Sequence, residues 1–187
     1  MKVLIIDNFD SFTYNLHHYV SEFVDVCDVV RNDRLSELDI TSYDKFILSP
    51  GPSLPSDHPE LFRFLTKYSE TKSILGICLG LQSISEFYGA NLINLDFVKH
   101  GVTSENNIII QDSIFSGIPS NFKIGHYHSW VVDKDTLPDC LTVTSENEEG
   151  LIMSLSHKEF DVKGIQFHPE SVLTDFGKKI IENWLIY

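Results

Sequence analysis

Two hydrophobic patterns alternate along the first half of the chain. Short, continuous apolar runs, typical of parallel strands covered on both faces, occupy residues 2–6, 26–30, 45–48 and 73–77. Between these runs apolar residues recur at helical spacing, which predicts helices near residues 16–24, 59–69 and 79–87. Strand, helix and strand in this order predict right-handed crossovers and a parallel sheet.

The pattern changes after Gly89. Short apolar segments with polar connections predict strands at residues 92–98, 106–110, 123–132, 141–145, 151–156 and 162–167, and a last helix at 175–186. These strands favour hairpins or a mixed sheet. The expected fold is α/β, a single domain over residues 1–187 with an open, mostly parallel central sheet, helices on both of its faces, and a smaller mixed or antiparallel sheet from the C-terminal half.

Composition narrows the class of protein. The formal net charge of −13, from 27 acidic and 14 basic residues, argues against a nucleic-acid partner, because phosphate binding needs a basic surface. Asp7 ends the first apolar run far short of a signal-peptide core or a membrane span. The three cysteines are odd in number and widely spaced, which favours free thiols and a reducing cytoplasm.

One cysteine lies where a nucleophile is best presented. The strand predicted at 73–77 runs into Gly76-Ile77-Cys78-Leu79-Gly80, and a helix is predicted to follow. A sharp strand-to-helix turn exposes a side chain beside free backbone N–H groups, and the positive end of the helix favours a thiolate. Flanking glycines avoid clashes and permit unusual backbone angles. The alternative is a buried structural cysteine.

A loop rich in proline and glycine follows the strand predicted at 45–48. Its sequence is Ser49-Pro50-Gly51-Pro52-Ser53-Leu54-Pro55, which predicts a rigid, irregular segment. In an open α/β sheet the loops at the carboxyl ends of strands form the ligand crevice. We therefore expect this loop and Cys78 at the same edge of the sheet.

A second group of chemical interest lies near the C-terminus, at His168-Pro169-Glu170. If the backbone here is extended, which Pro169 favours for the residue before it, His168 and Glu170 share a face. That arrangement suits a general base and the carboxylate that orients it. The alternative is a surface strand end with an incidental histidine and glutamate.

Other candidates are weaker. His126 and His128 have a spacing that allows metal binding only with a third ligand, which the sequence does not supply. Cys27 alternates with apolar neighbours and Cys140 follows a turn, so both are interpreted as structural thiols. No metal site is predicted.

Taken together, several motifs resemble those of the class I (triad) glutamine amidotransferases, in particular the small subunits of chorismate-using synthases. The resemblance covers essentially the whole chain. It rests on D-N-F-D-S-F-T-Y-N-L at 7–16, L-S-P-G-P at 48–52, G-I-C-L-G-L-Q at 76–82, H-S-W at 128–130 and Q-F-H-P-E-S at 166–171. The N-terminal motif favours the chorismate-using group within the class.

The resemblance implies a reaction and a partner. Cys78 would attack the side-chain carboxamide of L-glutamine, with His168 and Glu170 completing a catalytic triad. Backbone N–H groups of Leu79 and of the loop that runs from Gly51 through Pro52 to Ser53 would form the oxyanion hole. The positions that would hold glutamine are Gln82, Ser129 and Trp130.

Ammonia would pass to a synthase (component I) subunit that binds chorismate, with the anthranilate-forming subunit favoured over the aminodeoxychorismate-forming one or a shared role. The implied fold is flavodoxin-like, and the family needs no metal or cofactor on this chain. Two alternatives stay open: a γ-glutamyl peptidase or other cysteine hydrolase on the same fold, and a catalytically silent regulatory subunit.

The chain departs from the family pattern at four positions. The family often has glycine at Ser53, histidine at Leu81 and arginine at His126, and a basic residue is common at Val102, next to a matching His-Gly pair at 100–101. None of these departures removes a catalytic group.

Overall fold

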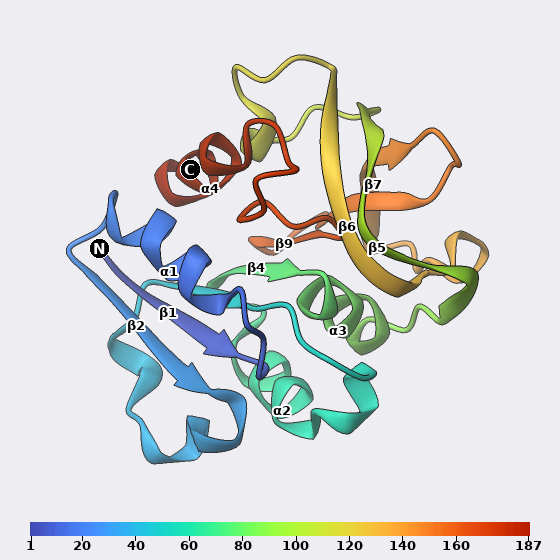
Figure 1. The fold of residues 1–187 in the computed structure, drawn as a ribbon. Helices are drawn as coiled ribbons and strands as arrows, with labels where there is room; N and C mark the ends of the chain where they lie inside the picture. The colour runs from blue at the N-terminus through green and yellow to red at the C-terminus, as the bar shows by residue number, and fades with distance from the viewer.

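A computed structural model describes residues 1–187 (Figure 1). Nine strands form one sheet in the order β2-β1-β3-β4-β9-β8-β7-β5-β6. The strands are β1 (Lys2–Asp7), β2 (Val26–Arg31), β3 (Lys45–Leu48), β4 (Ser73–Ile77), β5 (Leu92–Ile108), β6 (Asn121–Val132), β7 (Leu141–Asn147), β8 (Ile152–His157) and β9 (Val162–Ile165). The helices are α1 (Thr13–Ser21), α2 (Pro59–Tyr68), α3 (Leu79–Phe87) and α4 (Gly177–Ile186), with five short 3-10 turns between elements.

The strands from β2 to β9 in this order form the parallel half of the sheet. Residues alternate between its two faces along each strand. Val3 and Ile5 of β1 pack in the cluster that includes α1 and α4, whereas Leu4 and Ile6 pack in the cluster that includes α2 and α3. Helices therefore cover both faces, as the continuous apolar runs predicted (Figure 1).

The remaining pairings, from β9 through β8, β7 and β5 to β6, are antiparallel. The separate smaller sheet predicted for the C-terminal half is therefore wrong: β9 pairs with β4 in parallel and with β8 in antiparallel, and joins the two halves into one sheet. Parallel and antiparallel pairings are equally numerous, so the mostly parallel sheet that the sequence predicted is borne out in part, in the half from β2 to β9.

The two strands predicted at 92–98 and 106–110 are one long strand, β5. Its pairing with β6 is interrupted between Asn94 and Lys99 and again between His100 and Val102. Gly101 has a left-handed φ of 69° at the second interruption, which is typical of a bulge. The bulges let polar residues that broke the apolar pattern remain within one strand.

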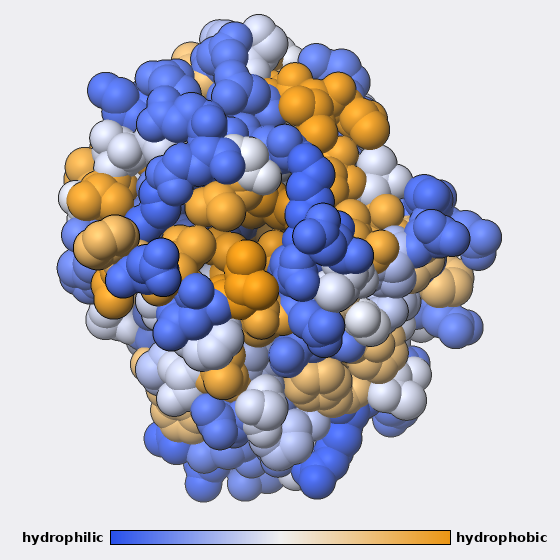
Figure 2. Space-filling model, turned by 90° about the vertical axis from the view of Figure 1, so that its right-hand side faces the viewer, coloured by the Kyte–Doolittle hydropathy of each residue, from blue (hydrophilic) through white to orange (hydrophobic).

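The antiparallel half presents apolar side chains at the surface. Figure 2 views this side and shows apolar surface lying between hydrophilic stretches. The exposed apolar side chains of β5 are Ile93, Phe97, Val98 and Val102. No helix in the chain is both long enough and apolar enough to cross a membrane.

Candidate active site

Cys78 forms the turn between β4 and α3, as predicted, and its backbone carries the strain of that turn. Its φ is 52° and its ψ is −103°, a left-handed φ that non-glycine residues rarely adopt. The neighbouring Gly76 and Gly80 have no positive φ. The expectation that these glycines supply unusual angles is therefore wrong.

Their role is to allow close approach of the backbone. A Cβ on Gly76 would lie 2.4 Å from the carbonyl carbon of Gly80, and a Cβ on Gly80 would lie 2.3 Å from the carbonyl oxygen of Leu48. The turn can close onto β3 and β4 only if both positions lack a side chain.

Cys78 as a whole residue is 5% exposed. Its backbone N–H donates to the carbonyl of Ile165 at 2.8 Å, which ties the turn to the end of β9, and its own carbonyl accepts the first bond of α3 from Gln82 at 3.0 Å. The sulfur lies at the N-terminus of α3, where Leu79 begins the helix with an N–H that has no partner within the helix. The amide of Gln166 also donates to Sγ, at 3.6 Å.

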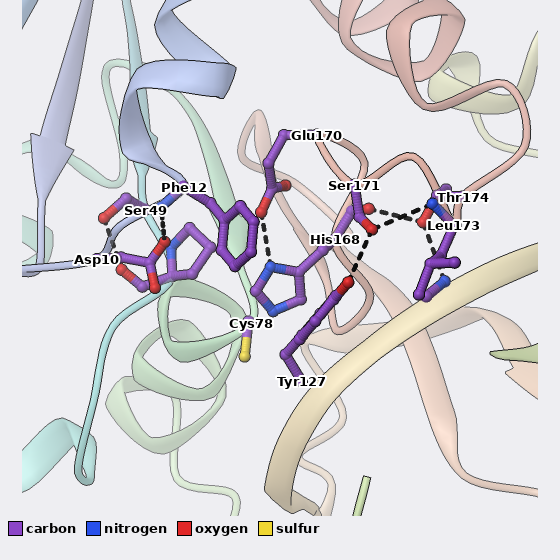
Figure 3. Close-up of polar contacts among 12 residues, drawn as sticks. Asp10, Phe12, Ser49, Cys78, Tyr127, His168, Glu170, Ser171, Leu173 and Thr174 are labelled. Atoms are coloured by element: carbon purple, nitrogen blue, oxygen red, sulfur yellow. Dashed lines mark hydrogen bonds and ion pairs between the residues drawn. The ribbon is translucent and has the colours of Figure 1, made fainter. Parts of the chain in front are cut away.

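His168 and Glu170 lie beside the thiol. His168 Nδ1 and Glu170 Oε1 are 2.6 Å apart, and both side chains are buried. Figure 3 shows the imidazole between Glu170 on one side and Cys78 on the other. The extended backbone on which this pair was predicted is wrong, because Ser171 N–H donates to the His168 carbonyl at 3.2 Å across a turn. The turn, rather than strand alternation, brings the two side chains together.

The pair changes the protonation of the imidazole. Burial lowers the pKa of His168, but the charge of Glu170 and the neighbouring Cys78 together raise it more, so the pKa lies well above 6.5. Nε2 has no hydrogen-bond partner within ordinary geometry and faces the thiol. The ring nitrogen that is not bonded to Glu170 is therefore the one that faces the sulfur.

Several residues that the sequence interpretation did not identify hold His168 in place. The backbone N–H of His168 donates to the carbonyl of Gly125 in β6 at 3.2 Å, and the His168 carbonyl accepts from the Thr174 hydroxyl at 2.6 Å. The ring of Tyr127 packs edge-on against the imidazole, with centroids 5.0 Å apart. The Tyr127 hydroxyl lies 3.2 Å from Ser171 Oγ (Figure 3). Only the folded chain brings these separated segments together.

A pocket of about 180 Å³ opens over the thiol. It contains most of the residues assigned by resemblance, and it adds Val98, Tyr127 and His128. Its lining is Gly51, Pro52, Ser53, Cys78, Gln82, Val98, Tyr127, His128, Ser129 and Trp130. A larger hollow of about 310 Å³ lies between α2 and residues 32–40 and contains neither Cys78 nor His168. The chemistry, rather than the size, identifies the candidate site.

Gln82 is 3% exposed and its amide is already bonded within the protein. Nε2 donates to the carbonyl of Trp130 at 2.9 Å and to Oε1 of Gln166 at 3.2 Å. These bonds link α3, β6 and the segment after β9. Gln82 therefore has a structural function in the pocket wall, and its contact with glutamine stays a prediction.

The positions that depart from the family pattern have clear surroundings. Ser53 has a left-handed φ of 68°, which explains why glycine is common there. Leu81 is fully buried and lies over Gly164, where an added Cβ would meet it at 3.0 Å. Val102 is 45% exposed on β5.

His126, the fourth departure, belongs to a buried chain behind the pocket. His126 Nε2 lies 2.6 Å from the Ser104 hydroxyl, and its Nδ1 lies 3.0 Å from His128 Nε2. Burial lowers the pKa of His126 to about 4 and that of His128 to about 3. Both rings are therefore neutral at pH 7, and each uses a ring nitrogen to bond its neighbour.

The other two cysteines lie away from this site. All three thiols are free. Burial raises the pKa of the Cys27 thiol to about 11, which disfavours a thiolate there. Cys140 packs at the edge of the apolar cluster under α2 and α3. Cys78 alone combines a strained turn, a helix N-terminus and a neighbouring imidazole.

An α/β sheet with a cysteine at a strand-to-helix turn and a histidine–carboxylate pair beside it is the architecture of enzymes that cleave through a cysteine nucleophile. The model of the class-I glutamine amidotransferase family matches residues 4–187. The chain belongs to this family and is a glutamine amidotransferase.

Named relatives and solved structures agree with this assignment. A Haemophilus influenzae protein provisionally named anthranilate synthase component II is 43% identical over 99% of this chain and 96% of its own. Aminodeoxychorismate synthase component 2 of Klebsiella aerogenes is 40% identical over 98% of both chains. A Thermoplasma acidophilum structure, provisionally described as one subunit of a GMP synthase, superposes with a TM-score of 0.86 at 27% identity, covering 99% of this chain and 92% of that one.

Proposed function

We propose that this chain, as one catalytic unit over residues 1–187, hydrolyses L-glutamine to glutamate and ammonia through Cys78, His168 and Glu170. The observation that carries the proposal is the placement of Cys78 at the strained turn, with the bonded His168–Glu170 pair beside its sulfur. A buried imidazole of raised pKa next to a thiol is suited to accept its proton and to keep the resulting thiolate paired.

The proposed reaction has two steps. The Cys78 thiolate attacks the side-chain carbonyl carbon of glutamine, and His168 transfers its proton from Nε2 to the departing nitrogen, which releases ammonia and leaves a γ-glutamyl thioester. His168 then accepts a proton from water as the water attacks the thioester and the C–S bond breaks. Glutamate leaves, its carboxyl proton passes to solvent, and the Cys78 thiolate is restored beside the protonated His168. Glu170 orients the ring and stabilises the imidazolium at each stage.

The negative charge that develops on the side-chain carbonyl oxygen of glutamine needs hydrogen-bond donors. Leu79 offers a first-turn N–H of α3, and the loop Gly51, Pro52 and Ser53 lies in the same pocket. The N–H groups of Gly51 and Ser53 donate to no other group of the protein. Removing one such donor in enzymes of this kind costs roughly 3 to 4 kcal/mol of transition-state stabilisation.

We further propose that the ammonia passes to a chorismate-using synthase subunit. The support is the naming of full-length relatives as second components of anthranilate or aminodeoxychorismate synthases. A second support is Val98, which lines the pocket while 71% exposed, next to the exposed Phe97. An apolar surface at the mouth of a site that releases ammonia suits a partner that receives it.

The free thiols suit a cytoplasmic location.

The test uses the chain together with each candidate synthase subunit, chorismate and either glutamine or ammonium. We expect Cys78→Ser to abolish glutamine-dependent product formation while ammonium-dependent formation continues, because only the glutaminase step needs the thiolate. Identification of the aromatic product distinguishes anthranilate, which we favour, from aminodeoxychorismate.

Cys140→Ser is the matched control, since it removes a thiol outside the pocket and should leave both activities unchanged. Full use of glutamine by the Cys78→Ser complex contradicts the proposal. Loss of ammonium-dependent synthesis would also contradict it, because Cys78 would then act in the partner's reaction.

A further inference from the structure

A chain of buried hydrogen bonds connects β1 to the loop over the thiol. Asn8, at the end of β1, donates from Nδ2 to the carbonyl of Ser49 at 2.8 Å. Asn32 donates from Nδ2 to Asn8 Oδ1 at 2.9 Å and to His58 Nδ1 at 2.8 Å. His58 Nε2 lies 3.0 Å from the carbonyl oxygen of Pro52. The side chains that form this chain are 0%, 2% and 6% exposed for Asn8, Asn32 and His58.

The direction of each bond is fixed because both ends of the chain are backbone carbonyls, which only accept. The Ser49 carbonyl requires the nitrogen of the Asn8 amide, so Asn8 Oδ1 faces Asn32 and accepts from it. Asn32 then has one N–H left, which it donates to His58 Nδ1. The imidazole must therefore carry its proton on Nε2, and that proton is donated to Pro52.

This last bond orients a peptide group of the loop. The chain contains no cis peptide bonds, and in a trans peptide the C=O and the following N–H point in opposite directions. His58 holds the Pro52 carbonyl on its own side, so the Ser53 N–H points away from His58. Pro52 and Ser53 line the pocket over Cys78, and the Ser53 N–H has no partner in the protein.

The orientation needs such support. Ser53 has a φ of 68°, a left-handed conformation that costs a non-glycine residue free energy. A loop with glycine at this position would avoid that cost. In this chain the His58 bond to Pro52 stabilises the conformation from outside the pocket, across a network drawn from three separate segments.

We propose that His58 is a positioning residue that aims the Ser53 N–H at the oxyanion formed from glutamine. His58 touches no reacting atom and acts through the Pro52–Ser53 peptide, with Asn32 and Asn8 fixing its tautomer. The inference rests on the proposed function of Cys78 and adds the device that sets one donor of its oxyanion hole.

Two amide substitutions that differ by one methylene separate this role from general packing. In His58→Asn the side-chain oxygen can take the place of Nδ1 and accept from Asn32, but the amide is too short to reach Pro52. In His58→Gln the amide nitrogen reaches the position of Nε2 and can donate to Pro52. We expect His58→Asn to lower kcat for glutamine hydrolysis by roughly 10- to 100-fold with little change in KM, as for a misaligned oxyanion donor.

We expect His58→Gln to restore most of kcat. The rate of Cys78 alkylation by iodoacetamide should stay at the wild-type value in both variants, because alkylation uses the thiolate and not the oxyanion hole. His18→Asn is the matched control, since His18 is a solvent-exposed histidine of α1 and its substitution should change none of these rates. Thermal unfolding confirms that each variant is folded.

The proposal is overturned if His58→Asn keeps the wild-type kcat, if His58→Gln is as impaired as His58→Asn, or if alkylation falls in step with kcat, which would place the damage at the thiol itself. The wild-type chain distinguishes these failures from failure of the proposed function. If the wild-type complex forms no product from glutamine, the function is wrong. If it forms product and only the His58 variants behave differently from expectation, the positioning role is wrong.

Discussion

The two halves of the sheet differ in the polarity of their buried side chains and in the regularity of their strand pairing. In the parallel half, the side chains at the centres of β1, β3 and β4 are apolar and fully buried, and their pairings run without register shifts. In the antiparallel half, β5 and β7 have register shifts. Its buried side chains include many polar ones: Ser104, Asn106, His126, His128, Thr144, Ser145, Asn147 and Ser154.

The difference corresponds to a division of labour. The parallel half carries the strained Cys78 turn and the loop after β3, which need a rigid support because a backbone in a rare conformation persists only where its surroundings determine it. The antiparallel half supplies the pocket wall from β6 and the exposed apolar strand β5. The parallel half thus positions the nucleophile, and the antiparallel half forms the pocket wall beside it.

Strand β9 is the junction between the halves, and it explains the proximity of the thiol and its base. Ile77 and Ile165 are opposite each other at the ends of the parallel strands β4 and β9. The residues that follow them, Cys78 and the segment leading to His168, therefore leave the sheet at the same edge. A long separation in sequence becomes a contact between neighbouring strand ends.

The largest effect should come from breaking the close packing of the turn. In Gly80→Ala the new Cβ would lie 2.3 Å from the Leu48 carbonyl, so the turn must shift. We expect a loss of about 3 kcal/mol in the free energy of unfolding and a fall in glutamine hydrolysis of roughly 100-fold or more, because such displacements misalign the nucleophile. Urea unfolding and steady-state kinetics measure the two effects.

Gly164→Ala, in β9, is the control for this change. The three atoms nearest to its Cβ would be side-chain atoms of Leu81, at 3.0 to 3.1 Å, and no backbone atom, so a smaller displacement relieves this contact than the 2.3 Å contact with the Leu48 carbonyl. A loss of stability and activity equal to that of Gly80→Ala would show that the turn has no special requirement for close backbone approach.

The next largest effect should come from removing the charge of Glu170 beside His168. The charge of Glu170 raises the pKa of His168, so Glu170→Gln should lower that pKa and move the loss of the imidazolium to lower pH. NMR titration of the imidazole measures the shift directly, and the basic limb of the kcat/KM profile should move in the same direction. Activity at the optimum should fall by roughly 100-fold or more, as in other triads that lose their orienting carboxylate.

The raised pKa of His168 also makes the stability of the fold depend on pH. A histidine whose folded pKa lies above its unfolded value stabilises the fold fully below the unfolded pKa, and that contribution is lost as the pH rises through the folded pKa. The stability advantage of the wild type over Glu170→Gln should therefore shrink with rising pH above 6.5. An advantage that grows with pH would contradict the assigned direction.

The smallest effect tests the polar interior of the antiparallel half. Asn106 is fully buried and neither amide atom has a hydrogen-bond partner. Removing an unsatisfied buried amide should help, so Asn106→Leu should stabilise the protein by about 1 kcal/mol without changing kcat. Asn147 lies opposite it in register, but its Oδ1 accepts from the N–H groups of Glu149 and Leu151. Asn147→Leu should therefore destabilise, and a loss of stability in both variants would refute the distinction.

The halves also differ in how far the sequence predicts them. The bounds of β3, β4 and α3 agree with the apolar runs between clear turn signals, because strands buried on both faces leave a continuous apolar record. Strand β5 left no such record, since its bulges and half-exposed positions interrupt the period of two. That β9 pairs with both β4 and β8 depends on long-range pairing that no local pattern encodes.

At the candidate site, sequence reasoning predicted the thiol, the imidazole and the carboxylate because each occurs in a short motif. It did not identify Thr174, Tyr127 or His58 as supporting groups. These residues act through contacts with segments distant in sequence, such as the bond from Thr174 to the His168 carbonyl. The supporting interactions of a site are tertiary, and they become visible only in the fold.

The central claim is that the Cys78 sulfur attacks the side-chain amide of glutamine and that its C–N bond is then cleaved. The most direct measurement is mass spectrometry of the chain in complex with its synthase partner, quenched in acid during turnover of glutamine and then digested. The account predicts a γ-glutamyl thioester on the peptide that contains Cys78, absent without glutamine and absent in Cys78→Ser. Turnover with no adduct on any cysteine, or with the adduct on Cys27 or Cys140, would contradict it.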